Sequence, residues 1–163
     1  MSIPQSGGGP IEHHGQLAEY LSDGCKPKAD WRIGTEHEKF GYCDVSLKPL
    51  PFEGDRSIEA VLGALRDRHN WAEVCEGGKL TGLEKNGANV SLEPGGALEL
   101  SGAPLETIHE TCDEVNQHLR EVIDIASEMG VGFIGLGAAP TWSHVEMPLM
   151  PKGRYKLMDA YMG

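Results

Sequence analysis

WRIGTEHEKFGY, residues 31–42, places two carboxylates two residues apart among residues that favour β-strands. Successive side chains of a strand point to opposite faces, so Glu36 and Glu38 share one face with Phe40. Neighbouring like charges repel and oppose the strand unless a cation lies between them. We therefore predict a strand over residues 31–42 whose acidic face binds a hard divalent cation, although the solvated face of an antiparallel sheet carries the same E-x-E pattern.

A second acidic segment, SLEPGGALELSG at residues 91–102, repeats this theme further along the chain. Alternation places Glu93 on one face, and after a Pro-Gly-Gly interruption it places Glu99 and Ser101 opposite the neighbouring leucines. Mg²⁺ prefers oxygen ligands and keeps positions open for water and phosphate oxygens, so a shared acidic face predicts nucleotide chemistry. The four carboxylates expected on one concave face are Glu36, Glu38, Glu93 and Glu99.

The remaining periodicity predicts an α+β fold in which helices pack on an antiparallel sheet. Apolar residues alternate on both sides of a Lys85-Asn86-Gly87 hairpin turn, as antiparallel strands over residues 71–102 require. Helices are predicted within residues 11–21, 57–69 and 105–129, followed by a buried strand at 131–138 and a helix from Gly153. The longest helix is expected to pack through its apolar stripe, which leaves His109 and His118 in solvent.

Composition predicts one acidic domain or part of one. The chain has 163 residues, and its 14 basic and 25 acidic side chains give a formal net charge of -11, which argues against a nucleic-acid partner. No apolar run approaches the roughly 18 residues of a membrane span. The N-terminus lacks a signal-peptide pattern, so a cytoplasmic location is expected.

The start of the chain predicts a boundary. Residues 1–10 are rich in glycine and indicate a flexible entry, which together with the short helix forms a segment over residues 1–30 ahead of a domain at 31–163. The four cysteines show neither zinc-site nor C-x-x-C spacing and are expected to be free thiols.

MPKGRY, residues 150–155, places two basic side chains at the start of the last predicted helix. A helix N-terminus favours anions, so this position suits a carboxylate or a phosphate. Arg154 is the better candidate because its planar guanidinium binds a carboxylate through two hydrogen bonds, whereas Lys152 fits a surface role equally well. The sequence has no P-loop and no well-placed dinucleotide-binding glycine motif, which disfavours those two kinds of nucleotide site.

Four segments together resemble one known family. They are GTEHEKFG at residues 34–41, SLEPGG at 91–96, ELSGAP at 99–104 and MPKGRY at 150–155. In this order they are similar to the plant and proteobacterial type of glutamate–cysteine ligase, also called γ-glutamylcysteine synthetase. The resemblance implies a fold related to glutamine synthetase, with an antiparallel sheet that forms part of a funnel. Family members are several times longer, so the chain is expected to be an N-terminal fragment with an incomplete half-funnel.

The resemblance also implies a reaction: ATP-dependent ligation of the γ-carboxylate of L-glutamate to L-cysteine through γ-glutamyl phosphate, the first step of glutathione biosynthesis. The family's Mg²⁺ ligands match Glu36, Glu38, Glu93 and Glu99. The family motif implies a catalytic role for Arg154 and substrate binding by Lys152, Arg154 and Tyr155.

The expected partners are glutamate, cysteine and ATP, together with either a second copy of the chain or the remainder of a ligase chain. The absence of a Ser- and Arg-rich transit segment favours the cytoplasm over a plastid. Two other readings stay open at this point. One is a related carboxylate–amine ligase that uses another amine, and the other is a non-catalytic fragment that only binds divalent metal.

Overall fold

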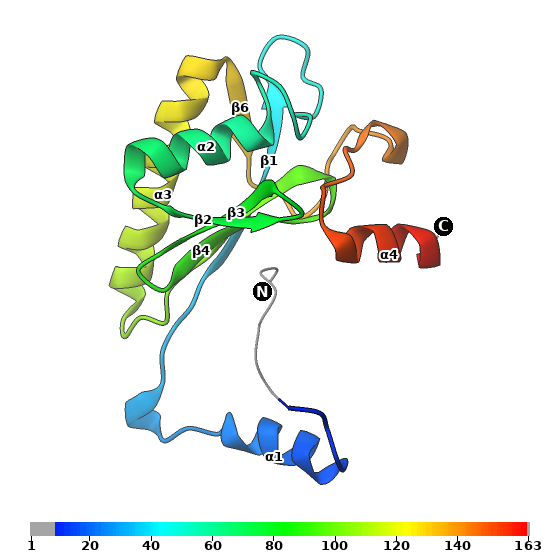
Figure 1. Ribbon diagram of the computed structural model, residues 1–163. Helices are drawn as coiled ribbons and strands as arrows, with labels where there is room; N and C mark the ends of the chain where they lie inside the picture. The colour runs from blue at the N-terminus through cyan, green and yellow to red at the C-terminus, as the bar shows by residue number, and fades with distance from the viewer. Residues whose placement is uncertain (1–8, 163) are drawn as a thin grey trace.

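The chain folds around one antiparallel sheet, which the computed structural model describes with its flanking helices over residues 9–162 (Figure 1). The six strands follow the order β2-β3-β4-β5-β1-β6. Their bounds are β1 Glu36–Cys43, β2 Ala72–Glu76, β3 Lys79–Lys85, β4 Ala88–Leu92, β5 Ala97–Ser101 and β6 Val131–Ile134. The predicted α+β class is confirmed. The flexible entry expected at residues 1–10 lies almost wholly outside the described residues, and the division at residue 30 stays a prediction.

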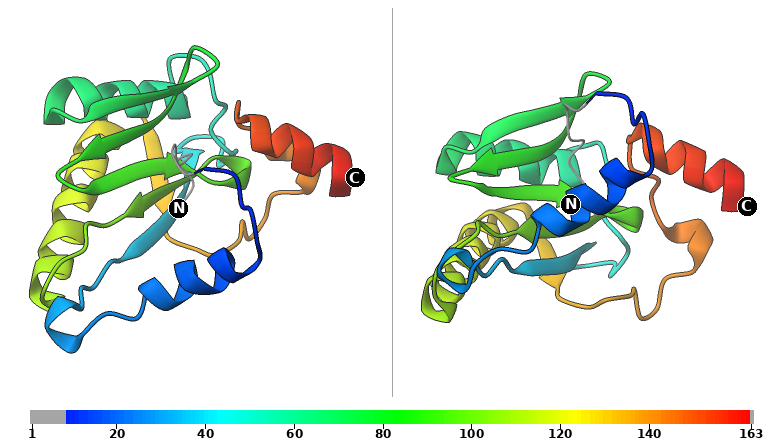
Figure 2. Two further views of the ribbon diagram at one scale, coloured as in Figure 1. Left: turned by 60° about the horizontal axis from the view of Figure 1, so that its bottom comes forward. Right: turned by 90° about the horizontal axis from the view of Figure 1, so that it is seen from below.

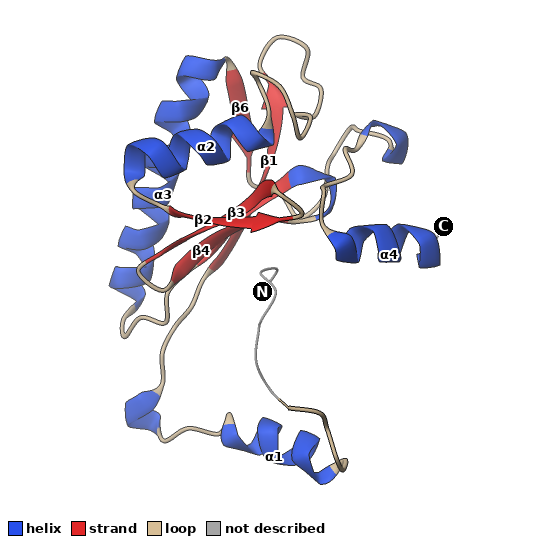
Figure 3. Cartoon of the chain, viewed as in Figure 1, coloured by secondary structure: helices blue, strands red, loops and turns tan. Residues whose placement is uncertain are grey.

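Helices flank the sheet unequally. The α-helices are α1 Gly15–Asp23, α2 Ile58–His69, α3 Ile108–Met129 and α4 Gly153–Met162. Helices α2 and α3 cover one face of the sheet (Figure 3), whereas α1 lies beyond the other face with no buried residue (Figures 1 and 2). The face toward α1, called the open face below, has less helical cover within residues 9–162, although Phe40, Ser91 and Glu99 on this face are buried. Within residues 9–162, no helix combines the length and the apolar character that a membrane crossing requires.

Helix α2 forms where the sequence predicts it. The Ser57 side chain caps its N-terminus by accepting a hydrogen bond from the Ala60 backbone N–H at 3.1 Å. Asn70 ends the helix in the left-handed conformation with φ 57°. The apolar residues that recur at three- and four-residue steps along this helix are all buried: Ile58, Val61, Leu62 and Leu65.

Helix α3 begins three residues later than its periodicity predicts. Leu105 forms an isolated bridge with Ile33, and the helix starts after Thr107, whose hydroxyl and Glu110 form a capping box. The prediction that His118 is solvated is wrong, because this side chain is 2 % exposed and its ring lies edge-on to Trp71 at 6.2 Å. The buried stripe of α3 therefore includes His118, which packs against the ring of Trp71. Ile108, at the start of the helix, is exposed.

The bounds of two strands, β1 and β6, differ from the prediction. Strand β1 starts at Glu36, five residues after the predicted start, because residues 28–30 form a 3₁₀ turn and the next stretch pairs only through an isolated bridge at Ile33 and the Thr35 carbonyl. Strand β6 is shorter than predicted and lies at the sheet edge, so Ile134 is 42 % exposed and the expected burial is wrong.

The structure agrees with two local predictions, the hairpin turn after β3 and the free cysteine thiols. Asn86 and Gly87 have φ of 53° and 85° and join β3 to β4, as a two-residue hairpin turn with positive φ at both positions requires. The free thiols expected for the four cysteines are confirmed: Cys25, Cys43, Cys75 and Cys112.

The capping box of α3 generates a stability prediction. Thr107→Ala removes the hydroxyl that accepts the Glu110 backbone N–H and should lower the free energy of unfolding by about 1 kcal/mol. Thr107→Ser is the matched control, because it keeps that hydroxyl and should stay close to wild type. Urea denaturation followed by far-ultraviolet circular dichroism checks both, and an unchanged midpoint for Thr107→Ala would contradict the assignment.

Candidate functional site

Strand register places three of the four predicted carboxylates, Glu36, Glu38 and Glu99, on the open face. Glu38 lies directly opposite Glu99, and Glu36 lies directly opposite Ser101. Directly opposed residues of an antiparallel pair share a face. The alternate residues Leu98 and Leu100 point the other way and are fully buried beneath the helices. One face of the sheet is therefore core, and the other is acidic.

Glu99 is the central carboxylate of this face. It is only 4 % exposed, it accepts a hydrogen bond from the Ser101 hydroxyl, and Ser91 lies opposite it on β4. Burial raises the pKa of Glu99 above its usual range, the Ser101 hydrogen bond opposes this, and the nearby Glu93 and Glu36 add to the increase. Like charges directly opposite on neighbouring strands destabilise a sheet, so this position favours a proton or a cation.

Glu93 links the acidic face to the last helix. It follows β4, and its backbone N–H donates to the Ala97 carbonyl at 2.8 Å across the turn that the structure forms at Pro94–Gly96. Gly95 has φ 75°, a conformation that favours glycine, so the turn returns the chain directly into β5. The Glu93 carboxylate accepts a hydrogen bond from the Arg154 guanidinium at 3.2 Å.

The basic segment at the start of α4 is held against the end of β4. The Tyr155 hydroxyl donates to the Leu92 carbonyl at 2.7 Å, and burial raises the pKa of Tyr155 to about 12. Arg154 donates to the Tyr155 oxygen at 2.8 Å, while its side chain stays 43 % exposed. Two contacts therefore orient the guanidinium beside Glu93 and leave part of it accessible to a ligand.

Lys152 does not lie at the surface. Its residue is 2 % exposed, and its ammonium donates to the Leu92 carbonyl at 3.0 Å, so the surface role considered for it is wrong. Burial lowers the pKa of Lys152 to about 8, with a further contribution from the nearby Arg154. Both Lys152 and Tyr155 thus bind the same carbonyl and tether α4 to the sheet.

Sequence reasoning gave no role to Lys39, which the structure places behind the acidic face. The residue is 1 % exposed, and its ammonium donates to the Leu98 carbonyl at 3.3 Å and to the His37 carbonyl at 3.4 Å. Burial lowers its pKa to about 7, and the charge of Glu99 opposes that change. Its position in the alternating pattern indicated the reverse face, but pattern alone did not reveal that the face is buried there.

The carboxylates predicted to bind a metal do not form a closed cluster in the structure. Within residues 9–162, no group of three or more His, Cys, Asp or Glu side chains lies close enough together to hold a metal ion. The opposed Glu38 and Glu99 supply oxygen donors of the kind that Mg²⁺ prefers, so the chemistry of the pair fits this ion. The roles predicted for Glu36, Glu38, Glu93 and Glu99 stay predictions.

Fold and site define a protein with an acidic antiparallel sheet, open on one face and bordered by an oriented arginine. The model of "Glutamate-cysteine ligase family 2 (GCS2)" matches residues 32–163, so the chain belongs to this family. The expected family is confirmed.

Curated relatives match most of the chain but extend well beyond it. A glutamate–cysteine ligase of Medicago truncatula is 51% identical over 146 residues, which are 90% of this chain and 28% of the relative. The corresponding proteins of Oryza sativa subsp. japonica (ligase A) and Arabidopsis thaliana are 49% and 50% identical over the same share of this chain, which covers 29% and 27% of them. The names of all three describe those proteins as chloroplastic. The chain thus spans less than a third of these relatives, and its own cytoplasmic location stays a prediction.

Glu99 generates a prediction on pH and stability. A pKa that is higher in the folded state than its reference value of 4.5 stabilises the fold at low pH, and that stability is lost as the pH rises through the folded pKa. Without divalent ions, wild type should therefore lose more stability than Glu99→Gln between about pH 4 and about pH 8. Urea midpoints across this range provide the measurement, with the exposed Glu19→Gln as control. Parallel curves for wild type and Glu99→Gln would contradict it.

Proposed function

We propose that the complete protein joins the γ-carboxylate of L-glutamate to the amine of L-cysteine in an ATP-dependent reaction through γ-glutamyl phosphate. This is the first step of glutathione biosynthesis. Family membership supports the class of reaction. The observation that carries the proposal is the opposed pair Glu38 and Glu99, two carboxylates that the sheet register forces together on an open face.

The acidic face is the proposed Mg²⁺ site. The residues proposed to hold the metal are Glu36, Glu38, Glu93 and Glu99. When bound, Mg²⁺ neutralises phosphate charge and polarises phosphoryl oxygens, which is the main requirement of phosphoryl transfer. The fit rests on oxygen donors and on the cost of leaving Glu38 and Glu99 opposed without a cation.

Arg154 is the proposed catalytic side chain. Its guanidinium lies beside Glu93, is oriented by Tyr155, and keeps an accessible surface. A planar guanidinium in this setting can hold a phosphate or a substrate carboxylate through two hydrogen bonds and stabilise developing negative charge. Tyr155 and Lys152 support it by fixing the start of α4 on the Leu92 carbonyl, which extends their proposed substrate-binding role to positioning.

Two alternatives each have a direct test. A related ligase would turn over with another amine and not with cysteine, which a panel of amines reveals directly. The second alternative, a non-catalytic fragment, concerns the 163-residue chain alone, which spans 28% of a relative's length. Saturable ATP binding by the chain alone, measured by calorimetry, would count against that second reading.

The metal proposal predicts a large loss of activity in the full-length ligase. Glu36→Gln or Glu38→Gln should lower kcat at least about 100-fold, because each removes a carboxylate proposed to hold the Mg²⁺ that neutralises the charge of the reacting phosphoryl group. The control is Glu73→Gln on β2, which lies opposite Leu83 on the other face of the sheet and should keep activity. Product formation from ATP, glutamate and cysteine is measured, with circular dichroism to verify folding. Near-wild-type rates for both variants would refute the role.

A further inference from the structure

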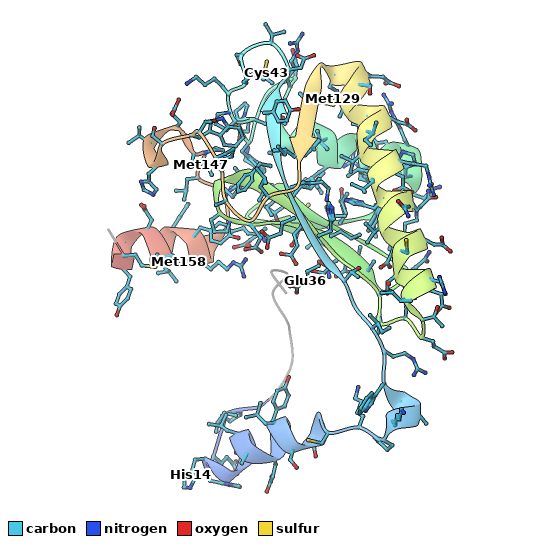
Figure 4. The ribbon with its side chains drawn as sticks, turned by 180° about the vertical axis from the view of Figure 1, so that it is seen from behind. His14, Glu36, Cys43, Met129, Met147 and Met158 are labelled. Carbon is cyan, nitrogen blue, oxygen red and sulfur yellow. The ribbon has the colours of Figure 1, made fainter. Side chains whose placement is uncertain are left out.

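The pairing of β1 with β5 continues past the acidic face with one irregularity. The Gly102 N–H donates to the Thr35 carbonyl at 2.7 Å, one step beyond Glu36, and the next pairing joins Ile33 to Leu105. One residue separates these two pairings on the β1 side and two separate them on the β5 side, the count found in a β-bulge. Figure 4 shows Glu36 where the chain enters β1 from the side of α1. The irregularity therefore lies directly beside a carboxylate proposed to bind metal.

Helix α3 supplies a hydrogen bond at this irregularity. The Ala103 N–H donates to Oε1 of Glu114 at 3.0 Å, and Ala103 is buried. The following residue, Pro104, has no N–H to donate. A buried N–H without an acceptor destabilises a fold, so the Glu114 carboxylate takes the place of a strand carbonyl at this point. A side chain of α3 thus holds the end of β5 from the covered face of the sheet (Figure 3).

Gly102 leaves room for this carboxylate. A Cβ atom on Gly102 would lie 2.3 Å from Oε2 of Glu114 and 2.8 Å from the hydroxyl oxygen of Thr35, both closer than Cβ contacts in real structures. The Gly102 backbone is outside the left-handed region, so space and not conformation favours glycine here. Both oxygens are buried without a hydrogen-bond partner among the described residues. The carboxylate is therefore kept in this position at a cost to stability.

We propose that Glu114 is a positioning residue of the metal site, which fixes the adjoining ends of β1 and β5 and thereby the carboxylate of Glu36. Glu114 reaches these strands from the covered face, whereas Glu36 lies on the open face, so Glu114 acts through the backbone. A displacement of about 1 Å can lower the rate of a catalysed reaction about 100-fold, which gives such an anchor its importance. The inference rests on the proposed function, because only that function gives Glu36 a metal ion to hold.

The test measures Mg²⁺ affinity by isothermal calorimetry of the full-length ligase. Glu114→Ala removes the acceptor of the Ala103 N–H and should weaken Mg²⁺ binding about tenfold, as loss of a group that orients metal ligands does. Glu114→Gln keeps an acceptor oxygen and should stay within about twofold of wild type. Thr107→Ala is the matched control, because it removes the cap of the same helix and should leave the Mg²⁺ affinity unchanged.

A second variant reaches the same contact from the strand. A Cβ on Gly102 would displace the flexible end of Glu114, so Gly102→Ala should also weaken Mg²⁺ binding. Because both variants break one hydrogen bond, the double variant should lose less affinity than the product of the two separate losses. A loss in the double variant equal to that product would contradict the inference. Circular dichroism verifies the folding of each variant.

Three further results would overturn the inference: unchanged Mg²⁺ affinity in Glu114→Ala, an equal loss in Glu114→Gln, or an equal loss in Thr107→Ala. Failure of the proposed metal role is distinguishable, because Glu36→Gln would then bind Mg²⁺ as wild type does. That result would remove both the metal role and the inference. Weaker binding in Glu36→Gln without weaker binding in Glu114→Ala would remove the inference alone.

Discussion

The pairing of β1 with β5 is the constraint on which the rest of the structure depends. It sets Glu38 opposite Glu99 on one face, and on the other face it directs Leu98 and Leu100 into the core below α2 and α3. A shift of one residue would reverse both faces at once, burying carboxylates and exposing leucines. The apolar face therefore fixes the register, and the register forces the carboxylates together. Packing energy opposes the electrostatic cost of the acidic face.

Three basic side chains, Lys39, Lys152 and Arg154, lie behind or beside the acidic face. Behind the sheet, Lys39 binds one carbonyl on each of the paired strands β1 and β5, and the charge of Glu99 raises the pKa of Lys39 against the effect of burial. At the end of β4, Arg154 contacts Glu93, while Lys152 and Tyr155 bind the Leu92 carbonyl. Helix α4 buries only Tyr155, so these polar contacts position it more than apolar packing does.

Alternation and periodicity predicted the structure correctly wherever the local structure depends on residues close together in the sequence. They predicted that Glu36 and Glu38 share a face, that a helix covers residues 57–69 and that the chain turns at Asn86-Gly87, because each depends on neighbours in sequence. The failures involve contacts between distant segments. His118 is buried because Trp71 lies beneath α3, and the helix starts late because Leu105 pairs with Ile33. The hydrogen bond from Ala103 to Glu114 is likewise a property of packing that no sequence pattern indicates.

Direct titration with Mg²⁺ tests the central claim, that the register-enforced pair of carboxylates is a cation site. The full-length ligase is titrated by isothermal calorimetry as wild type, as Glu38→Gln, and as Glu73→Gln on the covered face. We expect saturable binding by wild type and by Glu73→Gln, and binding at least about tenfold weaker in Glu38→Gln, since one of two opposed oxygen ligands loses its charge. Equal Mg²⁺ affinity in all three proteins would contradict it.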